Sequence, residues 1–244
     1  MLNLKQMKVK SLHSWQVSPE KARKIQQKLR DKVGLRSPFR SISQIRFIAG
    51  CDVGYDEKRR RAYGSVVLLT FPELKLVEKR GVMQASERIF PYLPGLLTFR
   101  EGPVLIAALK RLERSPDIII FDGQGIAHPV RFGLATHMGL LLGLPTIGCG
   151  KSILYGHYEE PVNLKGAHTF LKDERGELIG VALRTKRNVK PVFVSQGYRI
   201  ALDQALDIIL TCCRREKIPE PLRLAHLETV QALTSKSQKG NITN

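Results

Sequence analysis

Acidic residues are scarce in this chain, and long apolar runs are absent. Among 244 residues, 22 Asp and Glu stand against 40 Lys and Arg, which gives a formal net charge of +18. No apolar run reaches the roughly 18 to 20 residues that a membrane-spanning helix needs. No apolar stretch follows the N-terminal lysines, so a secretory signal is not expected either. We therefore predict a cytoplasmic protein that does not contact a membrane.

Cysteine is also rare, and its spacing excludes two classes of small protein. The four cysteines, at positions 51, 149, 212 and 213, form neither a CxxC pair nor a framework of paired residues. This pattern is not that of a disulfide-stapled domain or a zinc ribbon. It predicts buried, reduced thiols.

The excess of basic residues indicates a polyanionic partner. Hydrophobic residues make up 43% and charged residues 25% of the chain, which is typical of a globular protein. Lysine and arginine attract nucleic acid at long range, although a ribosome-associated or merely basic protein would look the same. We predict a basic helical extension over residues 1–40, one catalytic domain over 41–234, and a polar, frayed tail over 235–244.

The order of predicted elements is typical of an α/β fold. Ser18 followed by Pro19 predicts the start of a helix that extends to Val33. Further helices are expected over 104–114, 128–142 and 202–214, and strands over 46–52, 62–70, 74–82, 118–121, 146–149, 178–183 and 192–195. This order predicts a mixed central sheet with helices on both faces. The first three strands would form an antiparallel meander, and the later strands would be parallel.

Three acids occupy positions that suit a metal site. Asp52 and Asp122 each end a short apolar run, and Glu101 follows an aromatic segment framed by prolines. Carboxylates at strand ends meet at one rim of a sheet, where they can share a divalent cation. Taken singly, each acid is better explained as a solvated strand end or a turn residue. Asp122 is harder to dismiss, because a charge directly after four large apolar residues needs a partner.

Two other segments suggest contact with phosphates and bases. Gly123 would let the backbone approach a ligand, and Lys151 follows a strand in GCGKS, although Pro145 breaks the P-loop pattern and excludes a nucleotide-hydrolysing site of that type. The prolines around Tyr92 and Leu93 could display both side chains as a wedge between bases. A plain turn, an exposed lysine and an aromatic loop facing the core are the alternatives. His128 and His137 suit packing beside a helix better than zinc binding.

Three long segments identify a family. AGCDVGYD, FPYLPGLLTFREGP and FDGQGIAHPVRFGLATHMGLLLGLPTIGCGKS resemble endonuclease V, the deoxyinosine-directed repair nuclease. The resemblance runs from about Ile48 to His226. It implies a ribonuclease H-like fold and a hydrolysis that depends on Mg²⁺, with Mn²⁺ as a substitute. It also implies a nick at the second phosphodiester bond on the 3′ side of a deaminated base, which leaves a 3′-OH and a 5′-phosphate.

The resemblance also implies roles for individual residues. Asp52, Asp122 and Glu101 would hold the metal, Lys151 would contact the phosphate near the cut, and His226 would act through water or behind a metal ligand. The residues implied to contact the DNA or the lesion are Pro91, Tyr92, Leu93, Pro94, Gly95, Leu97 and Gly123. Leu93 and Cys51 replace more usual aliphatic residues with little change in apolar volume, so we expect neither to alter the chemistry.

The expected partner is single- or double-stranded DNA that contains deaminated bases, bound by a monomer. Two alternatives keep the same fold: a nuclease for inosine-containing RNA, and a nuclease selective for flap or branched DNA. A binding protein without catalysis is disfavoured by the intact set of acids.

Overall fold

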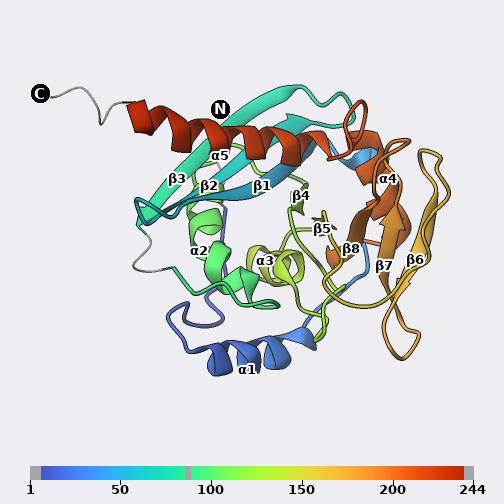
Figure 1. Cartoon of the computed structure of the whole chain (residues 1–244), viewed down its shortest axis with the longest axis horizontal. Coiled ribbons are helices and arrows are strands. Elements are labelled where there is room, and N and C mark those ends of the chain that lie inside the picture. The colour runs from blue at the N-terminus through green and yellow to red at the C-terminus, as the bar shows by residue number, and fades with distance from the viewer. Residues whose placement is uncertain (1–6, 86–88, 239–244) are drawn as a thin grey trace, which may run out of the picture.

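One eight-stranded mixed sheet organises the molecule. The computed structural model describes residues 7–85 and 89–238 (Figure 1). The strand order across the sheet is β3-β2-β1-β4-β5-β8-β7-β6. The strands are β1 (Phe47–Asp56), β2 (Arg61–Thr70), β3 (Leu76–Ala85), β4 (Ile118–Phe121), β5 (Thr146–Gly150), β6 (His168–Lys172), β7 (Leu178–Leu183) and β8 (Val192–Tyr198).

The sheet contains both parallel and antiparallel pairs of strands. Strands β1 to β3 form the predicted antiparallel meander, and β4 and β5 lie parallel to β1. Beyond β5, however, β8, β7 and β6 all pair antiparallel with their neighbours, so the prediction that the later strands are parallel was wrong for them. A short turn joins β6 and β7 and requires them to run in opposite directions, whereas β8 pairs with β5 across a long stretch of chain.

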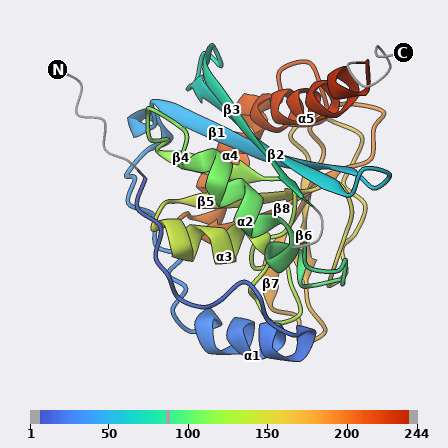
Figure 2. The ribbon, with the colours of Figure 1, turned by 90° about the vertical axis from the view of Figure 1, so that its left-hand side faces the viewer.

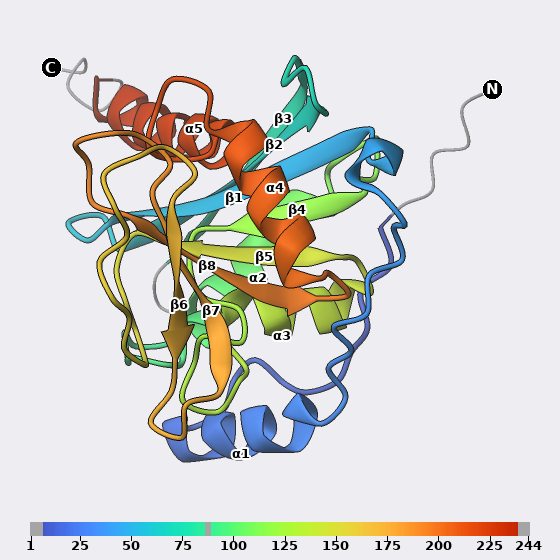
Figure 3. The same cartoon turned by 90° about the vertical axis from the view of Figure 1, so that its right-hand side faces the viewer.

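Two helices cover each face of the sheet. Helices α2 (Leu97–Leu109) and α3 (Leu134–Leu142) lie on one face (Figure 2), and α4 (Leu202–Cys212) and α5 (Glu220–Gln238) lie on the other (Figure 3). Alternate residues of the central strands fill the two cores, as the period of two in a strand requires. In β4, Ile118 and Ile120 join the core beneath α4 and α5, while Ile119 and Phe121 join the core beneath α2 and α3.

The N-terminal segment packs against the domain at the level of α3. Helix α1 (Pro19–Arg30) starts as predicted, with the Ser18 hydroxyl accepting a hydrogen bond from the Lys21 backbone. It lies beyond α3 from the sheet (Figure 1), and its buried Leu29 packs against Phe132 and Leu140. A short 3₁₀ turn, η1 (Ile42–Gln44), then leads into β1.

Several element boundaries differ from prediction. Strand β1 continues four residues past Asp52, because β2 pairs with it as far as Asp56. Helix α2 begins at Leu97 rather than after Pro103, so Glu101 lies on a helix. Helix α3 begins later than expected, and both β6 and α5 were missed.

The ends of the chain bear on the predicted tail. Helix α5 extends to Gln238, so residues 235–238 continue a helix, and residues 239–244 lie outside the described residues. In the described part of the chain, no helix is long and apolar enough to cross a membrane. All four cysteines are buried and unpaired, as their spacing suggested.

Candidate active site

Asp52 projects from β1 toward α5, which holds it in place. Its Oδ2 lies 3.1 Å from His226 Nδ1 and accepts a hydrogen bond of 3.0 Å from Thr229 Oγ1. Helix α5 can approach β1 this closely because Gly50 and Gly54 flank the aspartate on the same face. A Cβ on Gly50 would stand 2.2 Å from the backbone of Pro221, where only glycine fits.

Asp122 follows β4 directly and forms an ion pair with Lys151, which follows β5. The parallel pairing of β4 with β1 places Asp122 beside Asp52 at the same rim of the sheet. Burial raises the pKa of Asp122, and the ammonium of Lys151 opposes that rise. The position after the run IIIF therefore has the partner that its depth required.

Glu101 reaches the same place from the other face of the sheet, on the first turns of α2. Its pKa is raised to about 8, chiefly because the carboxyl is buried and also because Asp52 and Asp122 are negative. Tyr55 donates a long hydrogen bond of 3.4 Å to Glu101 Oε1, and Arg100 stacks on the Tyr55 ring, 4.2 Å from its centroid. Three acids are thus close enough to repel one another.

This set of donors fits a hard divalent cation. Carboxylate oxygens are the ligands that Mg²⁺ and Mn²⁺ prefer, and the mutual repulsion of the three acids is what a cation would relieve. Within the described residues, no three His, Cys, Asp or Glu side chains converge tightly enough to enclose an ion alone. A Mg²⁺ ion held here would need water and substrate phosphate to complete its shell, as Mg²⁺ usually does in proteins.

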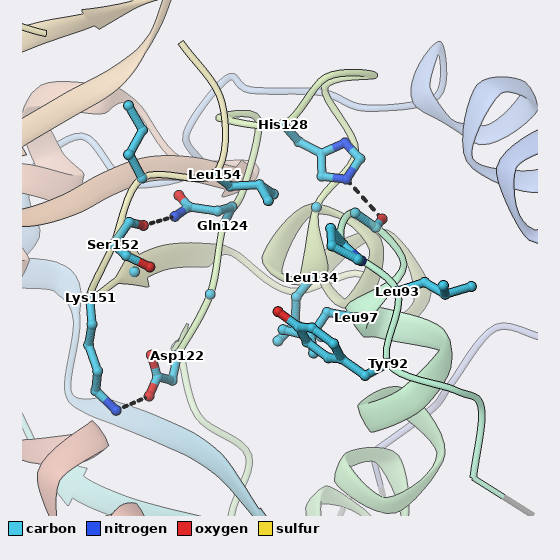
Figure 4. Close-up of a pocket in the computed structure, with 16 residues that line it drawn as sticks. Tyr92, Leu93, Leu97, Asp122, Gln124, His128, Leu134, Lys151, Ser152 and Leu154 are labelled. Carbon is cyan, nitrogen blue, oxygen red and sulfur yellow. Dashed lines mark hydrogen bonds and ion pairs between the residues drawn. The ribbon is translucent and has the colours of Figure 1, made fainter. Parts of the chain in front are cut away.

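A pocket of about 430 Å³ opens beside Asp122 and Lys151, on the α2 and α3 side of the sheet (Figure 4). This volume falls in the range of roughly 300 to 1,000 Å³ that small-molecule sites occupy. Leu97 and Leu134 contribute an apolar wall, and Tyr92 stands at the mouth with 68% of its surface exposed. The pocket is lined by residues 92–95, 97, 122–124, 128, 133, 134 and 150–154.

The loop that carries Tyr92 is anchored from below. The carbonyl of Gly95 accepts hydrogen bonds from Gln26 Nε2 at 2.8 Å and from His128 Nε2 at 2.9 Å. Gly95 has a φ of +82°, and a Cβ there would lie 3.1 Å from the His128 ring, so glycine suits this position on both counts. The loop that exposes Tyr92 is therefore held in place by hydrogen bonds, one of which comes from Gln26 of α1.

Comparison with known proteins identifies the family. A family model described as Endonuclease V matches residues 27–227. The chain belongs to the Endonuclease V family. It is 45% identical over 221 residues to the Endonuclease V of Methanothrix thermoacetophila, a match that covers 91% of this chain and 95% of that one.

Solved structures of this family share the fold. The Endonuclease V of Bacillus subtilis superposes with a TM-score of 0.87 at 33% identity, covering 96% of this chain and 100% of that one. That of Ciona intestinalis, solved in complex with a 24mer DNA containing an inosine followed by a ribo-adenosine, gives a TM-score of 0.77 at 27% identity, with coverage of 88% and 98%. The fold is therefore ribonuclease H-like, as expected, and the chain is an endonuclease that acts on DNA and depends on a metal ion.

The structure gathers most of the residues singled out from the sequence around this rim. Asp52, Glu101, Asp122, Lys151 and His226 lie at or beside the acid cluster. Of the residues expected to contact the lesion, Pro91 alone does not line the pocket; those that do are Tyr92, Leu93, Pro94, Gly95, Leu97 and Gly123.

Three contributors escaped the sequence analysis. Thr229 and Tyr55 hold carboxylates, and Gln124 lines the pocket, where its Nε2 donates to the Ser152 carbonyl at 2.9 Å. Thr229 lies three residues after His226, which is the spacing of neighbours on one helical face. That signal would have been visible had α5 been predicted. His128 anchors the Gly95 loop, and His137 lies buried with its Nε2 2.7 Å from His13 Nε2.

Proposed function

We propose that this chain is a DNA repair endonuclease for deaminated bases, chiefly deoxyinosine. It would hydrolyse the second phosphodiester bond 3′ to the lesion and leave a 3′-OH and a 5′-phosphate. The observation that carries the proposal is the pocket itself, which opens directly beside Asp122 and Lys151. A nuclease that cut without regard to bases would have no need for a cavity next to its acids.

The pocket suits a base taken out of the stack. The leucine wall offers apolar surface for the faces of a purine, and the backbone around Gly123 and Gly150 brings polar groups within reach of its edge. The exposed Tyr92 can fill the space that the extruded base leaves in the duplex. The Endonuclease V of Ciona intestinalis, whose structure contains inosine in DNA, supports deoxyinosine as the base.

The chemistry follows from the groups at the rim. Asp52, Asp122 and Glu101 would hold Mg²⁺, with Mn²⁺ as a substitute. When bound, the ion activates water and stabilises the charge that develops at phosphorus. Lys151 offers a second positive charge to the phosphate, and its contact with Asp122 fixes the position of its ammonium. His226 and Thr229 orient Asp52, so that one carboxylate oxygen is held toward α5.

A comparison of matched oligonucleotides tests this proposal. Duplexes that differ only in one deoxyinosine or deoxyguanosine are incubated with Mg²⁺ or with a chelator, and nicking rates are compared. We expect fast nicking only with both inosine and Mg²⁺. Equal rates on the two duplexes would remove the lesion-recognition claim, and nicking in chelator would remove the metal claim.

RNA that contains inosine is a second candidate substrate, because the DNA bound to the Ciona intestinalis relative carries a ribo-adenosine after the inosine. Matched DNA, RNA and chimeric strands, each with one inosine, separate the two. A higher rate on the all-RNA strand than on the all-DNA strand would make the chain an endoribonuclease first.

A further inference from the structure

Two lysines outside the acid cluster lie at the same rim of the sheet, and their ammonium groups have no evident role in stabilising the fold. Lys190 lies two residues before β8, and Lys217 lies in the loop between α4 and α5. Within the described part of the chain, neither ammonium has an ion-pair partner within 4 Å. The acids closest in sequence are engaged elsewhere, since Glu216 faces Lys186 at 3.9 Å and Glu220 pairs with Arg223 at 2.6 Å.

The fold brings these two lysines toward Lys151. Strand β8 pairs antiparallel with β5 so that Phe193 faces Gly150, which places Lys190, just before the start of β8, at the same edge as Lys151, just past the end of β5. Lys217 lies beside the loop that carries Lys190, because its carbonyl accepts a hydrogen bond from Thr185 of that loop. Burial lowers the pKa of Lys217, and the positive charges of Lys190 and Lys151 lower it further. Cations that repel one another in a folded protein indicate a site for a shared anion.

The loop that carries Lys217 is fixed in place. The Lys217 carbonyl accepts a hydrogen bond of 2.7 Å from the buried hydroxyl of Thr185, and Lys165 Nζ donates to the Cys213 carbonyl, also at 2.7 Å. The first bond ties the α4–α5 loop to the loop between β7 and β8, and the second ties it to the connection between β5 and β6. Hydrogen bonds to its backbone therefore hold the loop that carries Lys217 at this place in the fold.

The lysines and the base pocket lie on opposite sides of the acids. The pocket opens on the α2 and α3 side of the sheet, and Lys217 belongs to the α4 and α5 side, with Asp122 and Lys151 at the rim between them. A strand whose base enters the pocket and whose phosphate reaches the acids must continue across this rim. Under the proposed function the cut lies 3′ of the lesion, so the nucleotides beyond the acids are those 3′ of the cut.

We propose that Lys190 and Lys217, with Lys151, form a track that binds the phosphates on the 3′ side of the cut. This rests on the proposed function and extends it, because it assigns a direction to the strand and a length of substrate that the enzyme requires. The ligand is the sugar–phosphate backbone, so the track reads no sequence.

The test uses the full chain and the variants Lys190→Met, Lys217→Met and the double variant, which keep the length of the stem and remove the charge. Each is assayed on an inosine strand with a long 3′ arm and on the same strand ending just after the cut. We expect KM on the long arm to rise by about tenfold for the double variant, with kcat unchanged. On the truncated strand the variants and the unaltered chain should agree.

Two further measurements make the result specific. The slope of log K against log salt should fall by about one for each lysine removed. A single neutral methylphosphonate 3′ of the cut should weaken binding by the unaltered chain but add no further loss in the double variant. Lys110→Met serves as the matched control, because Lys110 is exposed at the far end of α2 from the pocket.

Three results would overturn the track. One is an equal loss on both strands, and another is the same loss from Lys110→Met. The third concerns Lys217→Arg, which keeps the charge. If this variant unfolds at the normal temperature but its KM is as high as that of Lys217→Met, the charge is not what binds the strand. Failure of the proposed function is distinguishable from these, because it would appear as an unaltered chain that does not nick inosine strands at all.

Discussion

At the scale of single residues, the site depends on carboxylates that are largely buried and held by one or two partners each. Asp122 has Lys151, Asp52 has His226 and Thr229, and Glu101 has only a long hydrogen bond from Tyr55. These unequal partners predict unequal behaviour. The two aspartates should be the principal metal ligands, and Glu101, whose pKa is raised to about 8, should hold a proton at neutral pH when no metal is bound.

Replacing either aspartate should separate cleavage from binding. We expect Asp52→Ala and Asp122→Ala to lower the nicking rate by roughly 10²- to 10³-fold or more, the size of loss seen when one transition-state stabiliser is removed. Binding to inosine DNA, measured by fluorescence anisotropy, should stay within a few fold because it depends on the basic surface. A variant that nicks at the normal rate would show that its aspartate is not a metal ligand.

The raised pKa of Glu101 predicts how stability depends on pH. Because the folded protein holds this proton up to a pKa of about 8 and the unfolded chain releases it near its ordinary value of 4.5, the folded state binds more protons between these values. In chelator, the midpoint of thermal unfolding should therefore fall as pH rises from about 5 to about 8. Saturating Mg²⁺ should oppose the fall at the upper end, since the metal favours the ionised carboxylate.

Glu101→Gln provides the matched control for this pH dependence, because it keeps the shape and removes the titration. The slope in chelator should be clearly smaller in that variant. An unchanged slope would assign the effect to another group, such as Asp122, whose pKa is also raised.

At the scale of elements, helix α5 and the Tyr92 loop position what the strands alone cannot. Helix α5 runs across β1 and presents His226 and Thr229 to Asp52, and its approach depends on Gly50. The loop depends on Gly95, whose carbonyl is held from α1 by Gln26 and from the β4–α3 connection by His128. In both elements, close packing of the backbone fixes the position of one side chain: Asp52 beside α5, and Tyr92 on the loop.

Thr229→Val tests the role of α5. Valine keeps the shape but removes the hydroxyl, whose proton Asp52 Oδ2 shares at 3.0 Å with the His226 carbonyl at 2.7 Å. The carboxylate therefore loses a shared hydrogen bond, worth about 1.5 kcal/mol. We expect kcat to fall by roughly tenfold, with Thr229→Ser retaining most of the activity. If valine and serine gave equal rates, the contact would be structural packing rather than orientation of Asp52.

Tyr92→Ala tests the loop. One aromatic side chain stacked on a base contributes about 1 to 3 kcal/mol, so affinity for inosine DNA should fall by roughly tenfold while affinity for undamaged DNA changes little. Competition binding with the two duplexes measures the difference. Equal losses on both would remove the wedge role and leave Tyr92 as an ordinary exposed aromatic residue.

Particular residues show how far the sequence could predict this structure. Asp122 was predictable because the four apolar residues before it indicate a buried strand, and a charged residue at that depth needs a partner. Glu101 was placed in the right neighbourhood but on the wrong element, since Pro103 suggested a helix start and instead lies inside α2. Here the surrounding packing overrides the usual effect of proline within a helix.

Long-range pairing was beyond the reach of local patterns. The reversal of β8 against β5 depends on which strands meet in three dimensions, and no pattern within β8 records it. Helix α5 was missed because its apolar residues do not form a clean stripe and its first residue stands between Pro219 and Pro221. Because α5 was not predicted, the shared helical face of His226 and Thr229 was not recognised either.

At the scale of the whole molecule, a strongly basic chain surrounds a small acidic centre at one rim of a single sheet. The basic surface attracts the polyanion, the pocket on one face selects a base, and the acids at the rim act on the backbone between the two faces. Association should therefore weaken steeply with salt, while the rate of the cut in the bound complex should not.

Mapping the cut on a duplex that carries one deoxyinosine tests the central claim most directly, because it examines the pocket and the acids together. The account predicts a single Mg²⁺-dependent nick at the second phosphodiester bond 3′ to the inosine, with a 3′-OH and a 5′-phosphate. A cut at the inosine itself, cuts scattered along the strand, or equal cutting of the undamaged duplex would contradict it.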